Sequence, residues 1–423
     1  MKNNWLFRVG FYLILTLPLF SLAPWFYPPE FGKTIIFRSV MTILLVLFAW
    51  QFLYQRESLP LPPVKKNLLV WLLLALLGAF ILATVFSQDP YFSLFGSPLR
   101  AGGVVNLIFY IILAILSFFI LTGKDWQKVW DVSFMVGAAV ALLGIVQFYQ
   151  PIGRPYSTMG NPIFLAMYLC LLLFMAVGFG IPEPNRTKKN RYFLGAGLFF
   201  VVILMTATRA VFLGMVIAGL YFLLFYNKKF LRLKMTAFLL VVLVGLSLFY
   251  VVTANHIPQS LQNNQFTNSI IQRISLKSIT SDERTDAWQI AFNAFKSKPI
   301  LGFGPENFQI AFDQFYNPKT IPYDRSVAFS NWWDRAHNIF LDIAVQTGIV
   351  GLLAYISLFG FLLFKLQQAK KNHENRFIKI HGMQTALIAY AVANFFSFDS
   401  FATYLLYFLL IGYSMHLIYE QQA

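Results

Sequence analysis

Charged residues are scarce in this sequence. Only 12% of its 423 residues are charged, whereas 58% are hydrophobic, and a soluble globular domain is about 25% charged. This composition predicts an integral membrane protein. The net charge of +16 could indicate a nucleic-acid-binding protein, but the basic residues form short clusters between apolar runs, as they do in membrane proteins. We therefore expect membrane lipids as partners, and no nucleic acid.

Cysteine is almost absent as well. Cys170, the single cysteine, lies inside an apolar run, which excludes an intramolecular disulfide and a cysteine-based metal site. A signal-peptide cleavage site is also missing. The first apolar run follows Lys2 and Arg8, but "SLAPWFYPPE" contains no clear small-x-small pattern. We interpret this first run as a retained membrane span.

Long apolar runs are abundant, and they predict an all-α polytopic membrane fold of about 12 transmembrane helices, since each span needs about 20 largely apolar residues. The two runs between 192 and 226 are interrupted only near Arg209. One continuous helix there would be roughly 52 Å long, too long for a hydrocarbon core of about 30 Å, so we predict a hairpin that turns near Arg209. The predicted spans cover 5–25, 34–54, 67–86, 103–122, 129–149, 161–181, 192–208, 210–226, 235–253, 338–364, 378–398 and 401–419.

Lysine and arginine are distributed unequally between the two sides of these spans. If the N-terminus is cytoplasmic, the short inner segments hold 20 of these residues and the short outer segments only 5. Because cytoplasmic loops are enriched in Lys and Arg, we expect both termini in the cytoplasm. One integral membrane domain, 1–423, would then carry a long extracytoplasmic loop, 253–335, between spans 9 and 10. The five outer residues are Lys33, Arg38, Arg100, Arg154 and Arg209.

The long loop is predicted to contain helices. In "TSDERTDAWQIAFNAFKSKP", Thr280 and Glu283 form a capping-box pattern, and the apolar residues that follow share one face of a helix. Arg284 lies in the middle of this face, so a helix resting on the membrane would direct it inward. The segment "PENFQIAFDQFY" predicts a second short helix with Pro305 in its first turn. The apolar face consists of Ala287, Trp288, Ala291, Ala294 and Phe295.

Ionisable residues are missing from the interior of most predicted spans. Ion-coupled transporters usually place such residues near the middle of the membrane, and neither His416 nor Asp342 begins a relay here. An ion-coupled mechanism is therefore disfavoured, whereas a flippase for a lipid-linked glycan stays an alternative. The spans whose interiors lack Asp, Glu, Lys and Arg are 67–86, 103–122, 161–181, 192–208, 210–226, 235–253 and 382–398.

Polar chemistry is concentrated at the outer mouth of one span. In "NWWDRAHNIFLDIAVQTGIVGLLAY", Asp334, Arg335, His337 and Asn338 precede a long apolar run. A structural scaffold would not explain this mixed cluster at one depth. An enzyme that acts at the outer face on a lipid-linked substrate would explain it.

Nucleotide-binding and metal-binding motifs are absent too. No Walker A or GxGxxG motif follows a strand, and there is no DxD, no HExxH and no Cys/His set. An enzyme outside the cytoplasm has no nucleotide sugars available, so we expect no cofactor and no metal. A polyprenyl diphosphate could supply the activated group, and arginine is suited to bind its diphosphate in a bidentate way.

Three segments carry a resemblance to a known family. "TATRA", "SDERTDAWQIAFNAFKSKPILGFGPENF" and "DRAHNIFLDIAVQTGIVGLLAY", within roughly 155–365, resemble the O-antigen ligase / O-antigen polymerase superfamily. The resemblance implies a metal-independent, inverting glycosyltransferase of the bacterial inner membrane. It would take a glycan from a polyprenyl-diphosphate carrier and transfer it to a free hydroxyl of a glycan or lipid acceptor.

The superfamily includes several activities. Its members are the ligase that joins O-antigen to lipid A–core, the polymerase that extends O-antigen, and oligosaccharyltransferases that act on protein hydroxyls. A chain of 423 residues without a large C-terminal soluble domain slightly favours a ligase, which is our prediction. The other two activities stay alternatives, and the sequence leaves the glycan and the oligomeric state open.

His337 is the candidate general base. With an unperturbed pKa of about 6.5, a histidine can be neutral and accept a proton from an attacking hydroxyl. The residues alone fit equally well a histidine that caps a helix at the membrane interface beside Trp332 and Trp333. The family resemblance favours the base.

Arg209 and Arg284 are the candidate donor ligands, which would bind the diphosphate and stabilise its charge as the sugar leaves. For Arg209 taken alone, an arginine that extends to the membrane interface is the commoner role. The tight hairpin and the family pattern favour diphosphate binding.

The polar neighbours of His337 are predicted to support it. Asp334 either orients His337 or caps the helix. Arg335 either contacts phosphate or, as we favour, pairs with Asp334. Asn338 and Asp342 are four residues apart and are expected to hydrogen-bond to each other.

Other residues are weaker candidates. Asp399, at the outer end of the eleventh predicted span, could reach the acceptor sugar. Arg100 and Arg154 could touch glycan or phosphate, although a plain surface charge is commoner. Gly348 and Gly351 would allow close helix packing.

Overall fold

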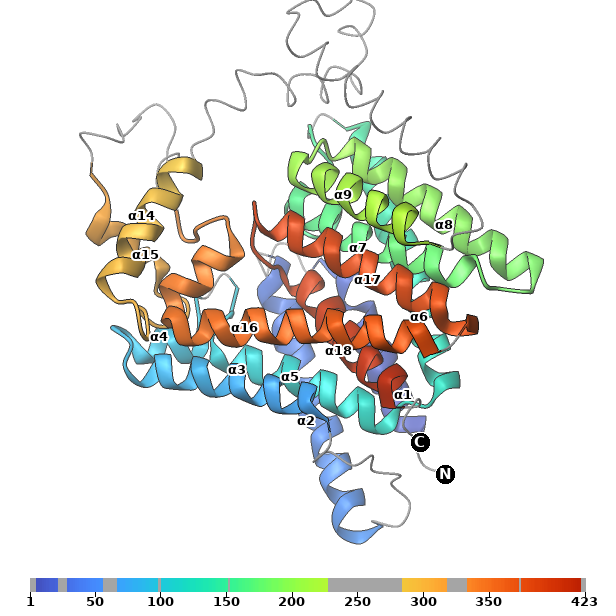
Figure 1. Ribbon diagram of the computed structural model, residues 1–423, viewed down its shortest axis with the longest axis horizontal. Helices are drawn as coiled ribbons and strands as arrows, with labels where there is room; N and C mark the ends of the chain where they lie inside the picture. The colour runs from blue at the N-terminus through green and yellow to red at the C-terminus, as the bar shows by residue number, and fades with distance from the viewer. Residues whose placement is uncertain are drawn as a thin grey trace, which may run out of the picture.

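The computed structural model describes residues 5–21, 29–55, 67–97, 100–150, 153–226, 284–317, 333–372 and 374–419 (Figure 1). Every regular element within these ranges is helical, as the composition predicts. The elements are α1 (Trp5–Thr16), η1 (Leu17–Leu19), α2 (Pro29–Tyr54), α3 (Leu68–Val85), α4 (Pro90–Phe95), α5 (Val104–Ile120), α6 (Gly123–Phe148), α7 (Pro162–Gly180), α8 (Arg186–Met205), α9 (Arg209–Phe225), α14 (Arg284–Ser297), α15 (Phe308–Phe315), α16 (Ile339–Asn372), α17 (Glu374–Asn394) and α18 (Phe401–Tyr419).

Several of these helices can cross a membrane. Within the described ranges, six are long and apolar enough by length and composition, and three shorter helices are also apolar. Each predicted span except 235–253, which lies outside the described residues, contains a helix, but the count of twelve spans stays a prediction. The six are Glu30–Tyr54, Leu68–Val85, Gly123–Phe148, Pro162–Gly180, Ile339–Lys370 and Phe401–Ile418, and the shorter ones are Trp5–Leu19, Val104–Ile120 and Arg209–Phe225.

The predicted hairpin at Arg209 is present. Helix α8 ends at Met205 and α9 begins at Arg209, with Thr208 as its N-cap residue. Only three residues separate the two helices, and Ala207 turns the chain with a φ of +47°. Arg209 therefore stands at the first position of a helix, at the tip of the hairpin.

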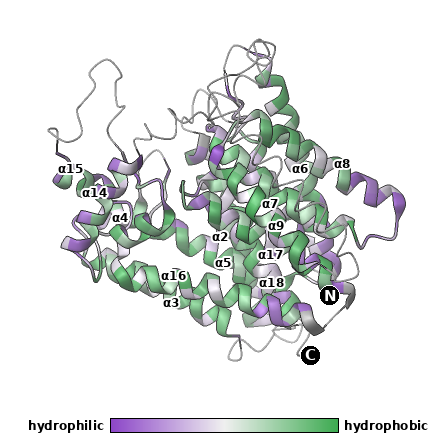
Figure 2. Cartoon of the chain, turned by 45° about the horizontal axis from the view of Figure 1, so that its top comes forward, coloured by the Kyte–Doolittle hydropathy of each residue, from purple (hydrophilic) through white to green (hydrophobic). Residues whose placement is uncertain are grey.

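Helices α7 and α18 form the centre of the bundle. Of the membrane-crossing window of each, 89% of the residues are buried, against 17% for α2. α7 and α17 approach closely because Gly178 and Gly382 face each other, and a Cβ at Gly382 would lie 2.7 Å from Cα of Gly178. α2 is instead mostly exposed or half-buried, and it consists largely of hydrophobic residues (Figure 2).

The helix ends gather as the predicted topology requires. Arg8 at the start of α1 forms an ion pair of 2.7 Å with Asp125 at the start of α6. Trp126 beside it contacts His416 at the end of α18, with ring centroids 6.1 Å apart. At the opposite end, the first residues of α2 and α18 meet, where N–H of Phe401 donates to Glu30. Which end faces the cytoplasm stays a prediction.

Two helices of the predicted long loop are described, and they cap that second end of the bundle (Figure 1). In α14, Ala287, Ala291 and Ala294 are buried as the periodicity predicts. α15 begins at Phe308, three residues after Pro305, because Glu306 has a φ of +64° that no helix tolerates. Of the predicted loop, 253–283, which includes the capping-box pair, and 318–332 lie outside the described residues.

A break in α16 joins this cap to the bundle. Gly348 has φ +62° and ψ −163°, which interrupts the helix and frees the carbonyls of Val345 and Gln346. N–H of Phe303 and N–H of Gly304 donate to these carbonyls, each at 2.9 Å. Just past the break, N–H of Ile349 donates to the carbonyl of Pro299 at 2.8 Å. Gly348 therefore serves a backbone junction rather than the close helix packing predicted from the sequence.

Replacing Gly348 by Ala should weaken the whole cap. A side chain at its positive φ costs roughly 1–2 kcal/mol, and its Cβ would collide with the carbonyl of Ile300. Thermal unfolding of the purified protein should show a lower midpoint for G348A. Gly360→Ala, in the same helix with no atom within 4 Å of the added Cβ, is the control and should match or exceed the wild type. Equal midpoints for the two variants would contradict the junction.

Candidate functional site

Asn338 forms the start of α16. Its side-chain Oδ1 accepts hydrogen bonds from N–H of Phe340 at 3.0 Å and N–H of Leu341 at 3.2 Å. It is therefore an N-cap residue, and the predicted side-chain bond between Asn338 and Asp342 is wrong. Because Asn338 caps the helix, His337 and Asp334 are not needed for that role.

Arg335 is held by two carboxylates from other parts of the sequence. It forms an ion pair with Glu306 and another of 3.2 Å with Asp342. Burial alone would lower the pKa of Arg335, but these two carboxylates raise it well above its usual range. The predicted pairing of Arg335 with Asp334 is wrong, and its guanidinium is already committed within the protein.

Asp342 joins this cluster to the helix. One of its oxygens accepts from N–H of Ala336 at 3.1 Å, and the other accepts from the side-chain amide of Gln346 at 2.8 Å. Gln346 in turn accepts from N–H of Glu306 at 2.8 Å. The chain before α16 and the segment around Glu306 are thus fixed to one side of the helix.

Asp334 pairs with Arg100, from the segment that precedes α5, at 3.0 Å. The carboxylate thus neither orients His337 nor caps the helix, which were the two roles predicted for it. The Arg100 guanidinium also lies 4.4 Å from the ring centroid of Phe398. Its Nη1 is buried and has no hydrogen-bond partner in the part of the chain that the structure describes. Arg100 is therefore not a plain surface charge, and its Nη1 could still donate a hydrogen bond to a ligand.

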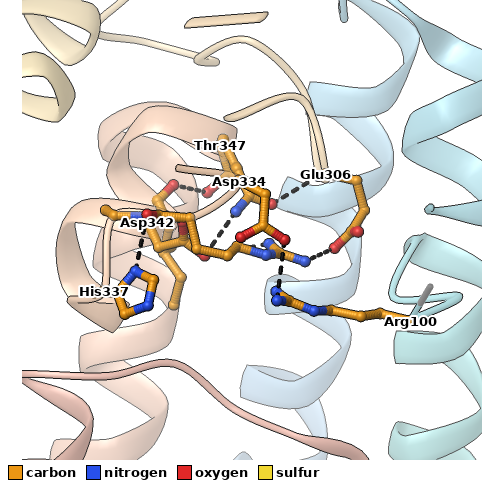
Figure 3. A network of polar contacts seen from close by, with 10 residues as sticks. Arg100, Glu306, Asp334, His337, Asp342 and Thr347 are labelled. Atoms are coloured by element: carbon orange, nitrogen blue, oxygen red, sulfur yellow. Dashed lines mark hydrogen bonds and ion pairs between the residues drawn. The ribbon is translucent and has the colours of Figure 1, made fainter. Parts of the chain in front are cut away.

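His337 lies beside this network with its ring turned away from the carboxylates (Figure 3). Nδ1 is 3.2 Å from the carbonyl of Arg335, and a carbonyl only accepts, so Nδ1 carries the proton and Nε2 carries the lone pair. The rings of Trp333 and Phe398 stand perpendicular to the imidazole, with centroids at 4.3 and 4.8 Å. The backbone of His337 has a φ of +50°, a strained conformation of the kind that clusters at functional sites.

The surroundings of His337 keep it neutral. Burial lowers its pKa to about 4, and the positive charges of Arg284 and Arg100 act in the same direction. The carbonyl of Arg335 and the carboxylate of Asp334 raise the pKa, but by less than burial lowers it. Both arginines therefore lie within electrostatic reach of the imidazole, and the neutral, proton-accepting form prevails at ordinary pH.

Arg284 is the first residue of α14. The packing of this helix against the bundle positions Arg284 near the site. Trp288, one turn further on, contacts Phe395 and Phe396 at the end of α17, with ring centroids 5.8 and 6.0 Å apart. Ile290 and Ala291 join a second apolar cluster with Val345 of α16. The amphipathic helix predicted from the sequence thus packs on the bundle itself.

Arg154 stabilises the hairpin that presents Arg209. Its Nε donates to the carbonyl of Thr206 at 2.6 Å and its Nη2 to the hydroxyl of Thr208 at 3.0 Å. The expectation of a surface charge is therefore wrong. α9 also packs against α17, where a Cβ at Gly214 would lie 2.8 Å from the carbonyl of Ala389. Arg209 thus stands on a helix that packs against α17, and Arg284 on a helix that contacts Phe395 and Phe396 directly after α17.

A polar cavity of about 70 Å³ lies next to the network, large enough for several water molecules. Asp399 lies on its wall, accepts from the hydroxyl of Tyr390 at 2.6 Å and from Asn394 at 3.3 Å, and has its pKa raised to about 6 by burial. The charged residues of the wall are Glu30, Arg100, Glu306, Arg335, Asp342 and Asp399.

Glu30 and Glu306 were not foreseen. Glu30 precedes the second apolar run, and Glu306 stands in "GPENF", which was read only as the start of a helix. A lone acid at the outer end of an apolar run was the available signal for Glu30. Nothing in the sequence around Glu306 indicates that its partner, Arg335, is 29 residues away.

The comparison with known families addresses this same stretch. Residues 194–356 match the model of the O-antigen ligase family, and the matched stretch contains Arg209, Arg284 and His337. The resemblance to the O-antigen ligase superfamily is confirmed. Together with its apolar helices, this O-antigen ligase domain makes the chain a multi-pass membrane protein.

A curated relative extends the similarity beyond that domain. The chain is 23% identical over 363 residues to a ComP-specific O-oligosaccharyltransferase of Acinetobacter baylyi. The aligned part covers 80% of this chain and 59% of the relative. The chain thus spans little more than half the length of that relative.

Removing Arg335 should destabilise the protein strongly. R335A would leave Glu306 and Asp342 as buried carboxylates without their partner, which costs about 3–5 kcal/mol. R100A is the control: its partner Asp334 has 34% of its side chain exposed, so its loss should cost only about 0–1 kcal/mol. Chemical unfolding of both variants measures the difference. If the two costs were similar, Arg335 would not hold the network together.

Proposed function

We propose that this protein is a membrane glycosyltransferase of the ligase type, which moves a glycan from a polyprenyl-diphosphate carrier to an acceptor hydroxyl. The single observation that carries the proposal is the state of His337. Its Nδ1–H is fixed by the carbonyl of Arg335, and its Nε2 has no hydrogen-bond partner in the described ranges. A neutral imidazole with a directed lone pair, near Arg284 and Arg100, is suited to deprotonate a hydroxyl beside an anionic donor.

The proposed reaction is a single displacement. Nε2 of His337 takes the proton of the acceptor hydroxyl as its oxygen forms a bond to the anomeric carbon of the donor sugar. The bond from that carbon to the diphosphate oxygen breaks, and the electron pair leaves with the polyprenyl diphosphate. Attack from the side opposite the leaving group inverts the anomeric configuration. No step needs a metal ion or a cofactor, and metal independence is part of the proposal.

The arginines are assigned two roles, binding of the diphosphate and positioning of His337. Arg284 and Arg209 would bind the diphosphate and stabilise its charge as it departs. Arg100, with its unused Nη1, is a third candidate. Arg335 is assigned to position His337 through its backbone carbonyl, because its guanidinium is occupied by Glu306 and Asp342.

The acceptor is proposed to be a hydroxyl of a lipid A–core or a similar glycolipid. A protein hydroxyl is the second candidate, because the relative from Acinetobacter baylyi is named an O-oligosaccharyltransferase. Asp399, on the wall of the cavity, is the proposed contact to acceptor hydroxyls. Transfer would take place at the outer face of the inner membrane, which follows from the predicted cytoplasmic location of both termini.

The decisive experiment is glycan transfer by the purified protein in EDTA. A polyprenyl-diphosphate glycan is offered with a lipid A–core, with a second donor molecule, or with a hydroxyl-bearing acceptor protein. We expect product on the lipid core, and none with His337→Ala. His416→Ala, at the opposite end of the bundle, is the control and should stay active.

Other results of this experiment would support a different function. Longer glycan on polyprenyl diphosphate would indicate a polymerase, and product on protein an oligosaccharyltransferase. If H337A transferred glycan as well as the wild type does, the general-base assignment would be wrong. Glycan movement across vesicles without any transfer would support a flippase in place of an enzyme.

The pH profile should reveal the neutral histidine. Because the pKa of His337 is about 4, the base form persists as pH falls from 8 to about 5.5, and kcat/KM should stay flat there. Below that, protonation should reduce kcat/KM. The bound diphosphate offsets the charges of Arg284 and Arg100, so kcat should fall at a higher pH than kcat/KM. A kcat/KM that already fell with a midpoint near 6.5 would contradict the buried site.

A further inference from the structure

We propose that the groove between α6 and α8 binds an anionic phospholipid. The groove has a volume of about 720 Å³, within the range of about 300–1,000 Å³ that small-molecule sites occupy. It lies at the end of the bundle where Arg8 meets Asp125, opposite the candidate site. The proposal is independent of the proposed transferase function.

The walls of the groove suit an acyl chain. α6 contributes Phe134, Met135 and Ala138, and α8 contributes Leu194 and Leu198. Met135 and Leu194 have 72% and 73% of their surface exposed, so these walls are open to the hydrocarbon of a membrane.

Gly195 leaves the floor of the groove unfilled. It lines the groove, and an added Cβ would find only the ring of Phe199, at 3.9 Å. An alanine or leucine at this position would fit sterically and would be the better helix former. Because position 195 is a glycine, the space between the two helices stays available for a ligand.

The mouth of the groove is basic. Lys188 and Arg191, with the polar side chains of Asn185 and Thr187, line it where α8 begins, and Figure 2 shows hydrophilic residues at this end of α8. Lys188 is already paired with Asp131 at 3.3 Å, whereas Arg191 is exposed and has no ion-pair partner among the residues that the structure describes.

The basic mouth and the apolar walls of the groove together favour an anionic lipid. A phosphate at the mouth would be attracted by Arg191 and by the positive end of the α8 dipole, while the chain below would contact only apolar side chains. Basic pockets between transmembrane helices on the cytoplasmic side bind anionic head groups, and the positive-inside count predicts that this end is cytoplasmic. A zwitterionic lipid would supply no net charge for the mouth to bind.

The test uses the full-length protein in detergent micelles that contain equal amounts of phosphatidylglycerol and phosphatidylcholine. Native mass spectrometry measures which lipid stays bound. The wild type should retain phosphatidylglycerol in preference. Arg191→Gln should weaken its retention about five-fold, as expected for one basic residue near a lipid phosphate, and Gly195→Leu should abolish it by filling the groove.

Two variants of the same helix are matched controls. Arg186→Gln removes an equal charge from a side chain that does not line the groove, and Gly197→Leu adds the same side chain at a position with no atom within 4 Å of its Cβ. Both should retain phosphatidylglycerol like the wild type. Equal retention of the two lipids by the wild type would overturn the preference for an anionic head group. Full retention by G195L would overturn the location.

Discussion

The break in α16 at Gly348 is the constraint on which the candidate site depends. A continuous helix would use the carbonyls of Val345 and Gln346 internally, whereas the break gives them to N–H groups of Phe303 and Gly304. Non-helical backbone inside a membrane bundle is tolerated where other protein groups satisfy it, and here the cap does so. The same pairing fixes the segment that carries Glu306. Together with the hydrogen bond from N–H of Glu306 to Gln346, it holds that carboxylate beside Arg335.

The rest of the site is held together by ion pairs between arginines and carboxylates. Arg335 takes two carboxylates and becomes a fixed support, whereas Arg100 takes only the partly exposed Asp334. This difference separates an arginine that shapes the protein from one that can exchange its partner. The proposed diphosphate would compete more easily for this partly exposed ion pair than for a buried one, because the two groups of a partly exposed pair keep more of their hydration. The carbonyl of Arg335 accepts from Nδ1–H of His337, so Arg335 positions the proposed base through its backbone.

The sequence predicted those parts of the fold that depend on periodicity and length. The hairpin at Arg209 follows from the thickness of a membrane, and the buried face of α14 follows from the helical repeat. Pairings within 334–342 were predicted from helical spacing and failed, because Asn338 caps α16 and the residues before it are not helical. One true partner, Asp342, lies within this stretch but off the predicted spacing. The others lie far away in the sequence: Glu306 precedes Arg335 by 29 residues, and Arg100 comes from another part of the bundle. The contact between Glu306 and Arg335 depends on the break in α16. A single glycine in an apolar run does not indicate that a helix is interrupted there.

Basic residues pair with carboxylates at both ends of the bundle. Around His337, Arg335 and Arg100 have carboxylate partners, so the field on the imidazole is moderate. A full complement of unpaired arginines there would make the imidazolium still less stable and the base weaker. At the other end, Arg8 and Lys188 are paired with Asp125 and Asp131, whereas Arg191 is exposed beside the groove and has no ion-pair partner among the described residues. Ion pairs at one end thus keep the field on His337 moderate for the proposed reaction, and Arg191 at the other end is the residue that the proposed lipid would meet.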